Sequence, residues 1–270
     1  MGGITSKYTP PSTLEFFIPG NLKAVGLLEA AERTDKYQTR CAAQPLNVIA
    51  RKDYIYRPIL TFKDAQLLSF TWTIPQWLKR DLAGQIPVIV LDPTAEGGMP
   101  HTRAGGILCF PGTNNMPNST TMCHELVHIH QRKYPAKWAA FYKDAFDFEI
   151  WSGTIPDELD NRRRINPDTI EMPNWIWRGR WVPVPVFLRP EEPTLRGMRV
   201  HFYDAVDHTW TSIPPREWFG FFGDSLSESE KEHPHELAAY WISTYDNKIK
   251  GCIAFTLFQR AMKKWFIGGY

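Results

Sequence analysis

The sequence predicts a single α+β domain, and three features in chain order carry that prediction. The run IPVIVL at 86–91 is typical of a buried strand. A second short apolar stretch at 107–110 is typical of another strand. A segment with helical spacing follows at 119–133, and further helical segments come after it. Strands followed by a run of helices indicate the α+β class.

The composition fits a folded protein of ordinary charge. The 270 residues suffice for one large domain or two small ones, and 43% apolar residues supply a sizeable core. Together with only 22% charged residues, this excludes disorder of the whole chain. The 31 Lys and Arg nearly balance the 29 Asp and Glu, so the net charge gives no general attraction to nucleic acid.

The chain is expected to begin with an extended arm. Residues 1–20 are rich in proline and predict this arm, and the single domain then spans 21–270. Apolar residues at helical spacing predict the first helix over 21–33. Apolar patches within 55–70 indicate a strand and a turn, and a proline opens a short helix at 75–83.

The later elements are predicted to be mostly helical. The hydroxyl of Ser119 or Thr120 is expected to cap the helix at 119–133. The segment 151–200 is rich in Pro, Trp and Arg and is predicted to be an irregular insertion. Further helices are predicted at 135–148, 234–245 and 253–266.

The cysteines indicate a reducing compartment. Cys41, Cys109, Cys123 and Cys252 are far apart and form no CxxC pair, which argues against a disulfide framework or a zinc knuckle. The chain shows no apolar stretch of membrane-spanning length and no secretory signal. We therefore expect reduced, mostly buried thiols and a cytoplasmic or otherwise reducing location.

The N-terminus fits the pattern for N-myristoylation. In Met1-Gly2-Gly3-Ile4-Thr5-Ser6, removal of the methionine exposes Gly2, and Ser6 supplies the hydroxyl of the pattern. Gly2 is therefore a candidate lipidation site. A single myristoyl chain there would give weak membrane association.

The strongest chemical signal is the run His124-Glu125-Leu126-Val127-His128 in the predicted helix. At 100° per residue the two histidines lie about 400° apart, so both project from one face and can share a metal ion. Glu125 lies about 60° from His128 around the axis, where its carboxylate flanks the metal without binding it. There it can deprotonate a metal-bound water, which is the chemistry of the HExxH motif.

This motif resembles that of the zincin metallopeptidases. The resemblance implies a zincin-like catalytic domain with a small sheet, an HExxH helix and a second ligand-bearing helix. The metzincin continuation HExxHxxGxxH is excluded, because Gln131 replaces its glycine and Tyr134 its third histidine. His130 lies about 240° from His124 around the helix and cannot join the same ion. The chain therefore resembles the gluzincin-like branch, with Zn²⁺ as its cofactor.

The third zinc ligand is expected downstream, because a catalytic zinc normally has three protein ligands and one open position. In gluzincin-type families this ligand is a glutamate on a second helix, and the resemblance favours Glu236. Pro234 marks a helix start beside it, and Ala238-Ala239 would let two helices approach closely. The other candidates are Glu149, the main rival, followed by Glu158 and Glu171.

The resemblance also implies an activity. It predicts hydrolysis of peptide bonds in a peptide or protein substrate by a metal-activated water, with Glu125 as general base. The strand at 107–110 is expected to line the cleft and to pair with an extended substrate. The oxyanion needs a further hydrogen-bond donor, for which the candidates are Tyr240, Tyr203, His208 and His201.

Two other functions stay open. The chain could be a catalytically inactive or structural zinc-binding protein, for example a myristoylated virion or membrane-associated component. Against this, a structural site has no use for a general base at Glu125. Segments 162–168 and 174–177 resemble parts of HExxH proteins found in large DNA viruses and algae.

Nucleic-acid binding is the other alternative. The arginines at 162–164 could contact phosphates while Trp175, Trp177 and Trp181 stack on bases. A solvated basic run beside core tryptophans is the simpler interpretation, so no specific nucleic acid is expected as a partner.

Overall fold

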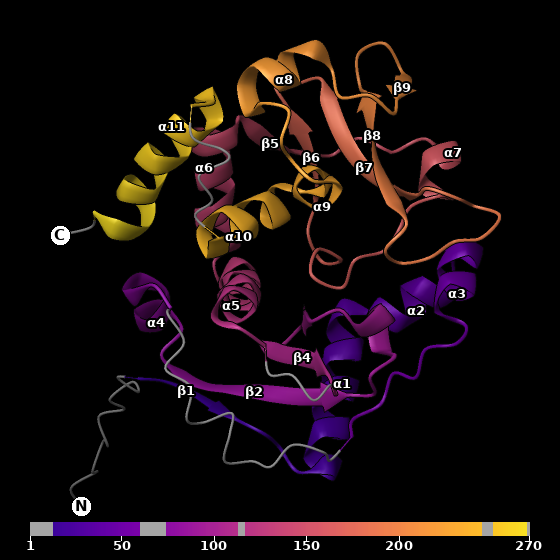
Figure 1. Cartoon of the computed structure of the whole chain (residues 1–270), viewed down its shortest axis with the longest axis vertical. Coiled ribbons are helices and arrows are strands. Elements are labelled where there is room, and N and C mark those ends of the chain that lie inside the picture. The colour runs from indigo at the N-terminus through magenta and orange to yellow at the C-terminus, as the bar shows by residue number, and fades with distance from the viewer. Residues whose placement is uncertain (1–12, 60–73, 113–116, 245–250, 269–270) are drawn as a thin grey trace, which may run out of the picture.

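The computed structural model describes residues 13–59, 74–112, 117–244 and 251–268. Within these ranges two β-sheets combine with helices, which confirms the predicted α+β class. Figure 1 shows one sheet in the lower half and the other in the upper half, with helices α5 (Ser119–Lys133) and α10 (Pro234–Thr244) between them. Gly2 and most of the predicted N-terminal arm lie outside the described residues.

The first sheet lies under the helix that carries the HExxH motif. Its strands, in the order β1-β2-β4-β3, are β1 (Leu14–Phe17), β2 (Gly84–Leu91), β4 (Ile107–Pro111) and β3 (His101–Arg103). Strand β2 is parallel to β1 and β4, and β3 is antiparallel to β4. Successive β2 side chains point to opposite faces: Val88 packs in the core with Leu126 of α5, and Ile89 in the core with Leu28 of α1. Both faces of β2 are therefore covered, as its continuous apolar run predicts.

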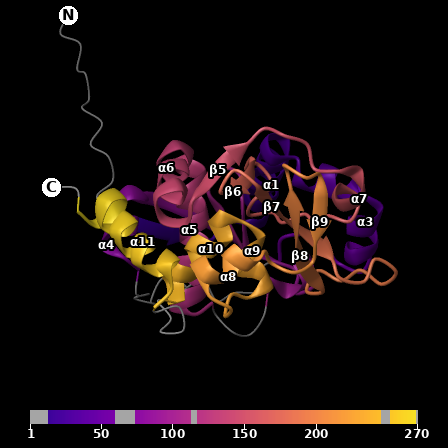
Figure 2. The same ribbon diagram turned by 90° about the horizontal axis from the view of Figure 1, so that it is seen from above.

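The helices predicted from the sequence are present, and those predicted at 75–83 and 135–148 each end two residues earlier than expected. Helix α5 (Ser119–Lys133) packs against β3 and β4 on one side and against α10 on the other, and α6 packs beside α11 (Figure 2). The others are α1 (Asn21–Asp35), α2 (Tyr37–Ala42), α3 (Pro45–Arg51), α4 (Gln76–Asp81), α6 (Pro135–Phe146), α7 (Asp157–Asp160), α8 (Arg216–Phe222), α9 (Glu228–Glu232), α10 (Pro234–Thr244) and α11 (Ile253–Met262).

The predicted cap of α5 is wrong by one residue. The Asn118 side chain, not that of Ser119 or Thr120, accepts a hydrogen bond from the Thr121 backbone N–H at 2.8 Å. Asparagine caps as well as serine does, because its side-chain oxygen reaches an orphan N–H of the first turn equally well.

The second sheet occupies a segment for which the sequence predicted no regular structure. Its strands are β5 (Phe148–Trp151), β6 (Asn174–Trp177), β7 (Trp181–Phe187), β8 (Met198–Asp204) and β9 (Thr209–Thr211), all antiparallel to their neighbours. Strands β6 and β7 and the start of β8 lie within 151–200, so the predicted irregular insertion is wrong there. Proline hides the strand pattern: Pro183 and Pro185 lie in β7, which pairs along its length with β8 but with β6 at Trp181 alone in the described chain. A strand side without a regular ladder tolerates residues that lack an N–H.

The cysteines and tryptophans behave as the sequence predicted. The four cysteines form no disulfide within the described residues, and Cys41, Cys109 and Cys123 are buried. Trp175 and Trp177 belong to the main core, which removes them as stacking groups for nucleic acid. No helix in the described part of the chain has the length and apolar character that a membrane crossing requires.

A buried ion pair joins α1 to the edge of the first sheet. The Arg103 guanidinium of β3 donates to both Asp35 carboxylate oxygens, at 2.8 and 2.7 Å, and Nη2 also donates to Glu32 at 2.9 Å. The Arg103 and Asp35 side chains are almost wholly buried. Burial opposes ionisation of Asp35, but the hydrogen bonds and charge of Arg103 outweigh it and lower the pKa of that carboxyl.

Replacing Arg103 should therefore leave the buried Asp35 carboxylate without its ion-pair partner. We expect Arg103→Met to lower the free energy of unfolding by about 3–5 kcal/mol at pH 7, measured by urea denaturation. The exposed Arg33→Met is the matched control and should change it by less than about 0.5 kcal/mol. In the wild type this contribution is full above about pH 4, the pKa of Asp in the unfolded chain, and is lost as the pH falls through the lower folded pKa. An Arg103→Met variant as stable as wild type at pH 7 would contradict the assignment.

Candidate metal site

Three of the predicted ligand residues converge between α5 and α10. The Nε2 atoms of His124 and His128 are 3.0 Å apart. Glu236 of α10 brings Oε2 to 3.4 Å from His124 Nε2 and Oε1 to 3.6 Å from His128 Nε2. The three ligand atoms lie within 4.8 Å of one another, so this group could hold a metal ion.

Small side chains allow the two helices to approach. Ala238 and Ala239 of α10 are fully buried in the same core as Leu126 and Val127 of α5. With Glu236 in the first turn of α10, this packing places its carboxylate over the histidine face of α5. The helix approach predicted from the alanine pair is present.

The rival carboxylates lie elsewhere. Glu149 on β5 is exposed and accepts a hydrogen bond from Lys143 Nζ at 2.5 Å. Glu171 pairs with Arg132, and Glu158 accepts from the Trp210 indole N–H at 3.3 Å. Of the four glutamates considered as ligands, Glu236 alone has a carboxylate oxygen within 4.8 Å of the ligand nitrogens of both His124 and His128.

The third histidine of α5 faces away from this group, as predicted. His130 Nε2 lies 3.2 Å from an Asp81 carboxylate oxygen, and its Nδ1 accepts the Trp138 indole N–H at 2.8 Å. His130 is therefore a buried structural side chain that anchors α5 to its neighbours.

A glutamine that the sequence analysis noted only as a departure from metzincins orients His128. Gln131 is fully buried, and its Nε2 donates to the His235 backbone carbonyl at 2.9 Å. This bond turns Oε1 toward His128 Nδ1, at 2.7 Å, so Nδ1 carries the hydrogen and donates. The Nε2 atom of His128 is thereby the one available as a ligand.

The charges in the site suit a cation. Burial alone would raise the pKa of Glu236, but the neighbouring His128 and His124 hold it well below its usual range. Burial likewise disfavours the charged form of His128, yet the Glu236 and Asp168 carboxylates outweigh it and raise its pKa to about 10. A bound metal cation would replace that proton, because ligating imidazole must be neutral.

Glu125 lies beside the ligand group with a different environment. Its side chain is buried, and its Oε2 atom has no hydrogen-bond partner among the described residues. Burial raises the pKa of Glu125 well above its usual value, and the nearby Asp168 carboxylate adds to the shift. A buried carboxyl group with a raised pKa and an unsatisfied oxygen, beside a candidate metal site, is typical of a group that exchanges protons.

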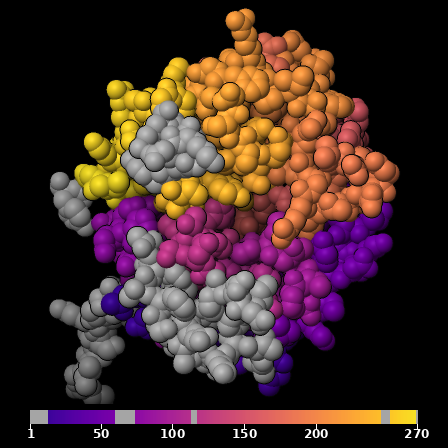
Figure 3. All heavy atoms as spheres, viewed as in Figure 1, coloured from indigo at the N-terminus to yellow at the C-terminus, as the bar shows by residue number. Residues whose placement is uncertain are grey.

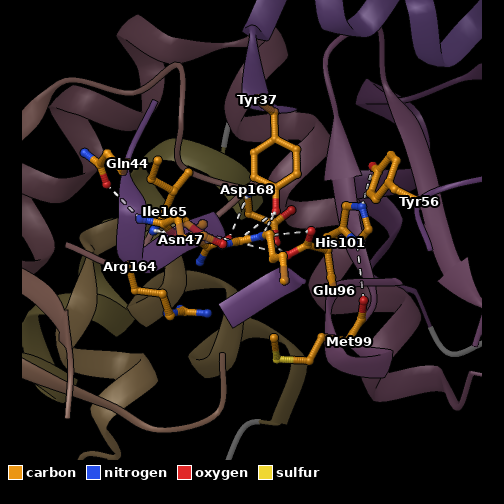
Figure 4. Close-up of polar contacts among 12 residues, drawn as sticks. Tyr37, Gln44, Asn47, Tyr56, Glu96, Met99, His101, Arg164, Ile165 and Asp168 are labelled. Atoms are coloured by element: carbon orange, nitrogen blue, oxygen red, sulfur yellow. Dashed lines mark hydrogen bonds and ion pairs between the residues drawn. The ribbon is translucent and has the colours of Figure 1, made fainter. Parts of the chain in front are cut away.

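His124, Glu125 and Glu236 line a cavity of about 520 Å³. In the space-filling view the magenta α5 segment lies between the purple N-terminal part and the orange and yellow C-terminal part (Figure 3). The cavity wall also includes Glu96, His101, Arg164, Asn166, Asp168 and Tyr240. Figure 4 shows Asp168 between Arg164 on one side and Glu96 and His101 on the other.

The arginine-rich segment contributes to this wall, which the sequence analysis missed. Arg164 is buried and donates to Glu232 Oε2 at 2.6 Å, so it does not belong to a solvated basic run. Asn166 and Asp168 follow it in a loop without regular structure. No periodicity marks such a loop, and its partners come from distant parts of the sequence.

Of the four candidate hydrogen-bond donors to the oxyanion, Tyr240 alone lies at the cavity. Tyr240 lines the cavity, and its ring centroid is 4.6 Å from that of His124. Burial raises its pKa to about 12, so it keeps its hydroxyl hydrogen at neutral pH. The other candidates do not line the cavity: Tyr203 and His208 bond to each other at 2.8 Å, and His201 stacks on Trp210.

The expected substrate strand is wrong. Strand β4 is already paired on both sides, with β2 and β3, and has no open edge for a substrate. The outer strand of this end of the sheet, in the described residues, is β3. Its Thr102 backbone N–H donates to Asp168 Oδ1 at 2.6 Å, so the loop already covers part of that edge.

Metal content should distinguish Glu236 from its main rival. We expect about one metal ion per chain in wild type and in Glu149→Gln, and a loss of most of it in Glu236→Gln, because only Glu236 shares the site with the histidines. Elemental analysis of protein purified without added metal measures this. A full complement of metal in Glu236→Gln, or its loss in Glu149→Gln, would refute the assignment.

No family model, curated protein or solved structure matches this chain. The candidate metal site therefore stands on its own geometry and chemistry.

Proposed function

We propose that the protein is a zinc-dependent metallopeptidase of the gluzincin-like type. The observation that carries this proposal is the buried Glu125, whose Oε2 atom has no hydrogen-bond partner among the described residues, beside a His-His-Glu group on a cavity of about 520 Å³. Catalysis by metal-activated water needs these three parts together: a metal site, a base next to it, and room for a substrate.

The donor set supports zinc. Two imidazole nitrogens and one carboxylate oxygen are the ligands of the catalytic His₂Glu zinc sites, which keep one position open. Gln131 directs the Nε2 atom of His128 toward the other two ligands, an arrangement typical of zinc-binding histidines. His124, His128 and Glu236 would hold the ion.

Zinc bound there would polarise a substrate carbonyl group and lower the pKa of a water molecule. Glu125 would take a proton from the attacking water and pass it to the nitrogen of the leaving amine. Its low-dielectric surroundings favour the protonated form, which helps the second step. The Tyr240 hydroxyl, protonated at neutral pH, would donate to the oxygen that gains negative charge.

The structural zinc alternative explains less. A structural zinc site is normally closed by four protein ligands, whereas this group holds three in the described part of the chain. A buried carboxylate oxygen without a hydrogen-bond partner, such as Glu125 Oε2 among the described residues, is costly, and a purely structural site would gain nothing from it.

Removing the base should abolish hydrolysis without removing the metal. We expect Glu125→Gln to retain its metal while peptide hydrolysis falls by about 10²- to 10⁴-fold, because the amide cannot accept the proton. A library of internally quenched fluorescent peptides measures the rate, and Glu149→Gln is the matched control. Unchanged hydrolysis in Glu125→Gln would refute its role as the base.

The hydroxyl of Tyr240 should matter to the rate more than to metal binding. For Tyr240→Phe we expect about a 10²-fold lower kcat with the same metal content, because only the hydrogen-bond donor is lost. Tyr203→Phe, in the second sheet, should leave kcat unchanged. Equal kcat values for the two variants would remove Tyr240 as the oxyanion donor.

A further inference from the structure

Asn166 makes a set of contacts that tie it to the ligand Glu236. Its Nδ2 donates to Glu236 Oε1 at 2.9 Å and to Glu232 Oε1 at 2.8 Å. Its Oδ1 accepts the Asp168 backbone N–H at 3.0 Å. A side-chain amide has two N–H hydrogens, so both are committed to the two carboxylates.

The second carboxylate is itself fixed on its far side. Glu232 is buried, and its Oε2 accepts from Arg164 Nη2 at 2.6 Å. The Arg164 charge offsets that of Glu232, so the pair is anchored and does not compete with Glu236 for the metal. Asn166 bridges this anchored pair to Glu236.

The loop that carries Asn166 is held by helix α3. Asn47 is fully buried, its Nδ2 donates to the Arg163 carbonyl at 2.8 Å, and its Oδ1 accepts the Ile165 N–H at 3.0 Å. Arg51 Nη2 donates to the Ile165 carbonyl at 2.8 Å. Figure 4 shows Asn47 and Ile165 in this contact. The backbone on the N-terminal side of Asn166 is therefore fixed by hydrogen bonds to another element.

We infer that Asn166 is the positioning residue for the metal ligand Glu236. Its hydrogen bond holds Oε1 and stops the carboxylate from rotating, which keeps Oε2 at 3.4 Å from His124 Nε2. A buried ligand without this bond would lose both a hydrogen-bond donor and its orientation. The inference rests on the metal site of the proposed function and not on peptide hydrolysis.

The direct test is metal affinity. Asn166→Leu keeps the volume of the side chain and removes both donors, so the Zn²⁺ affinity should fall about 10- to 100-fold, measured by competition with a chromogenic chelator. The matched control is Asn161→Leu, whose side chain is exposed in the same connection between α7 and β6 and should leave the affinity unchanged. If Asn166→Leu does not fold, Asn166→Ala is expected to show the same loss.

A second readout separates positioning from simple stabilisation of the loop. The absorption spectrum of the Co²⁺-loaded protein reports the geometry of the ligands, so it should change in the Asn166 variant and not in the Asn161 variant. Wild-type affinity and spectrum in a folded Asn166 variant, even one with a lower Tm, would overturn the inference. A wild-type protein that binds neither ion would overturn it together with the metal site. Neither measurement uses a substrate, so a failure of peptide hydrolysis does not affect the result.

Discussion

The buried carboxylates of this protein need partners that compensate their charge, and much of the structure depends on those partners. A buried carboxylate must be paired or hydrogen-bonded, because leaving one without a partner costs several kcal/mol. Most buried acids here satisfy that need: Asp35 pairs with Arg103, Glu232 with Arg164 and Glu96 with Arg51. Glu236 relies on the two histidines and on an amide. Glu125 stands apart, because no hydrogen bond compensates its Oε2 among the described residues, and this difference is the basis for proposing it as the base and not as a ligand.

Local patterns predicted the parts of the site that one helix encodes. The helical period alone places His124 and His128 on one face and His130 on another, because each residue adds 100° of rotation about the axis of the same helix. Glu236 was predicted from a resemblance supported by a helix start. Its rival Glu149 could be rejected only once the strand that carries it was known.

The parts that the sequence did not predict depend on contacts between distant segments. Gln131 orients His128 only because α10 presents the His235 carbonyl to it, and nothing in the sequence near Gln131 encodes that carbonyl. Asn166 lies in a loop whose path is set by α3. The second sheet was missed because Pro183 and Pro185 are atypical of a strand and because β7 pairs with β8, a segment distant in the sequence.

The hydrogen bonds between α3 and the loop before Asn166 join segments that are synthesised at very different times. The two histidines leave the ribosome more than 100 residues before Glu236, while the helix that holds the Asn166 loop is made earlier than either. Contacts of such long sequence separation form late in folding. A nascent or half-folded chain would therefore present the two imidazoles without the carboxylate, so the His-His-Glu group is complete only once these distant segments have come together.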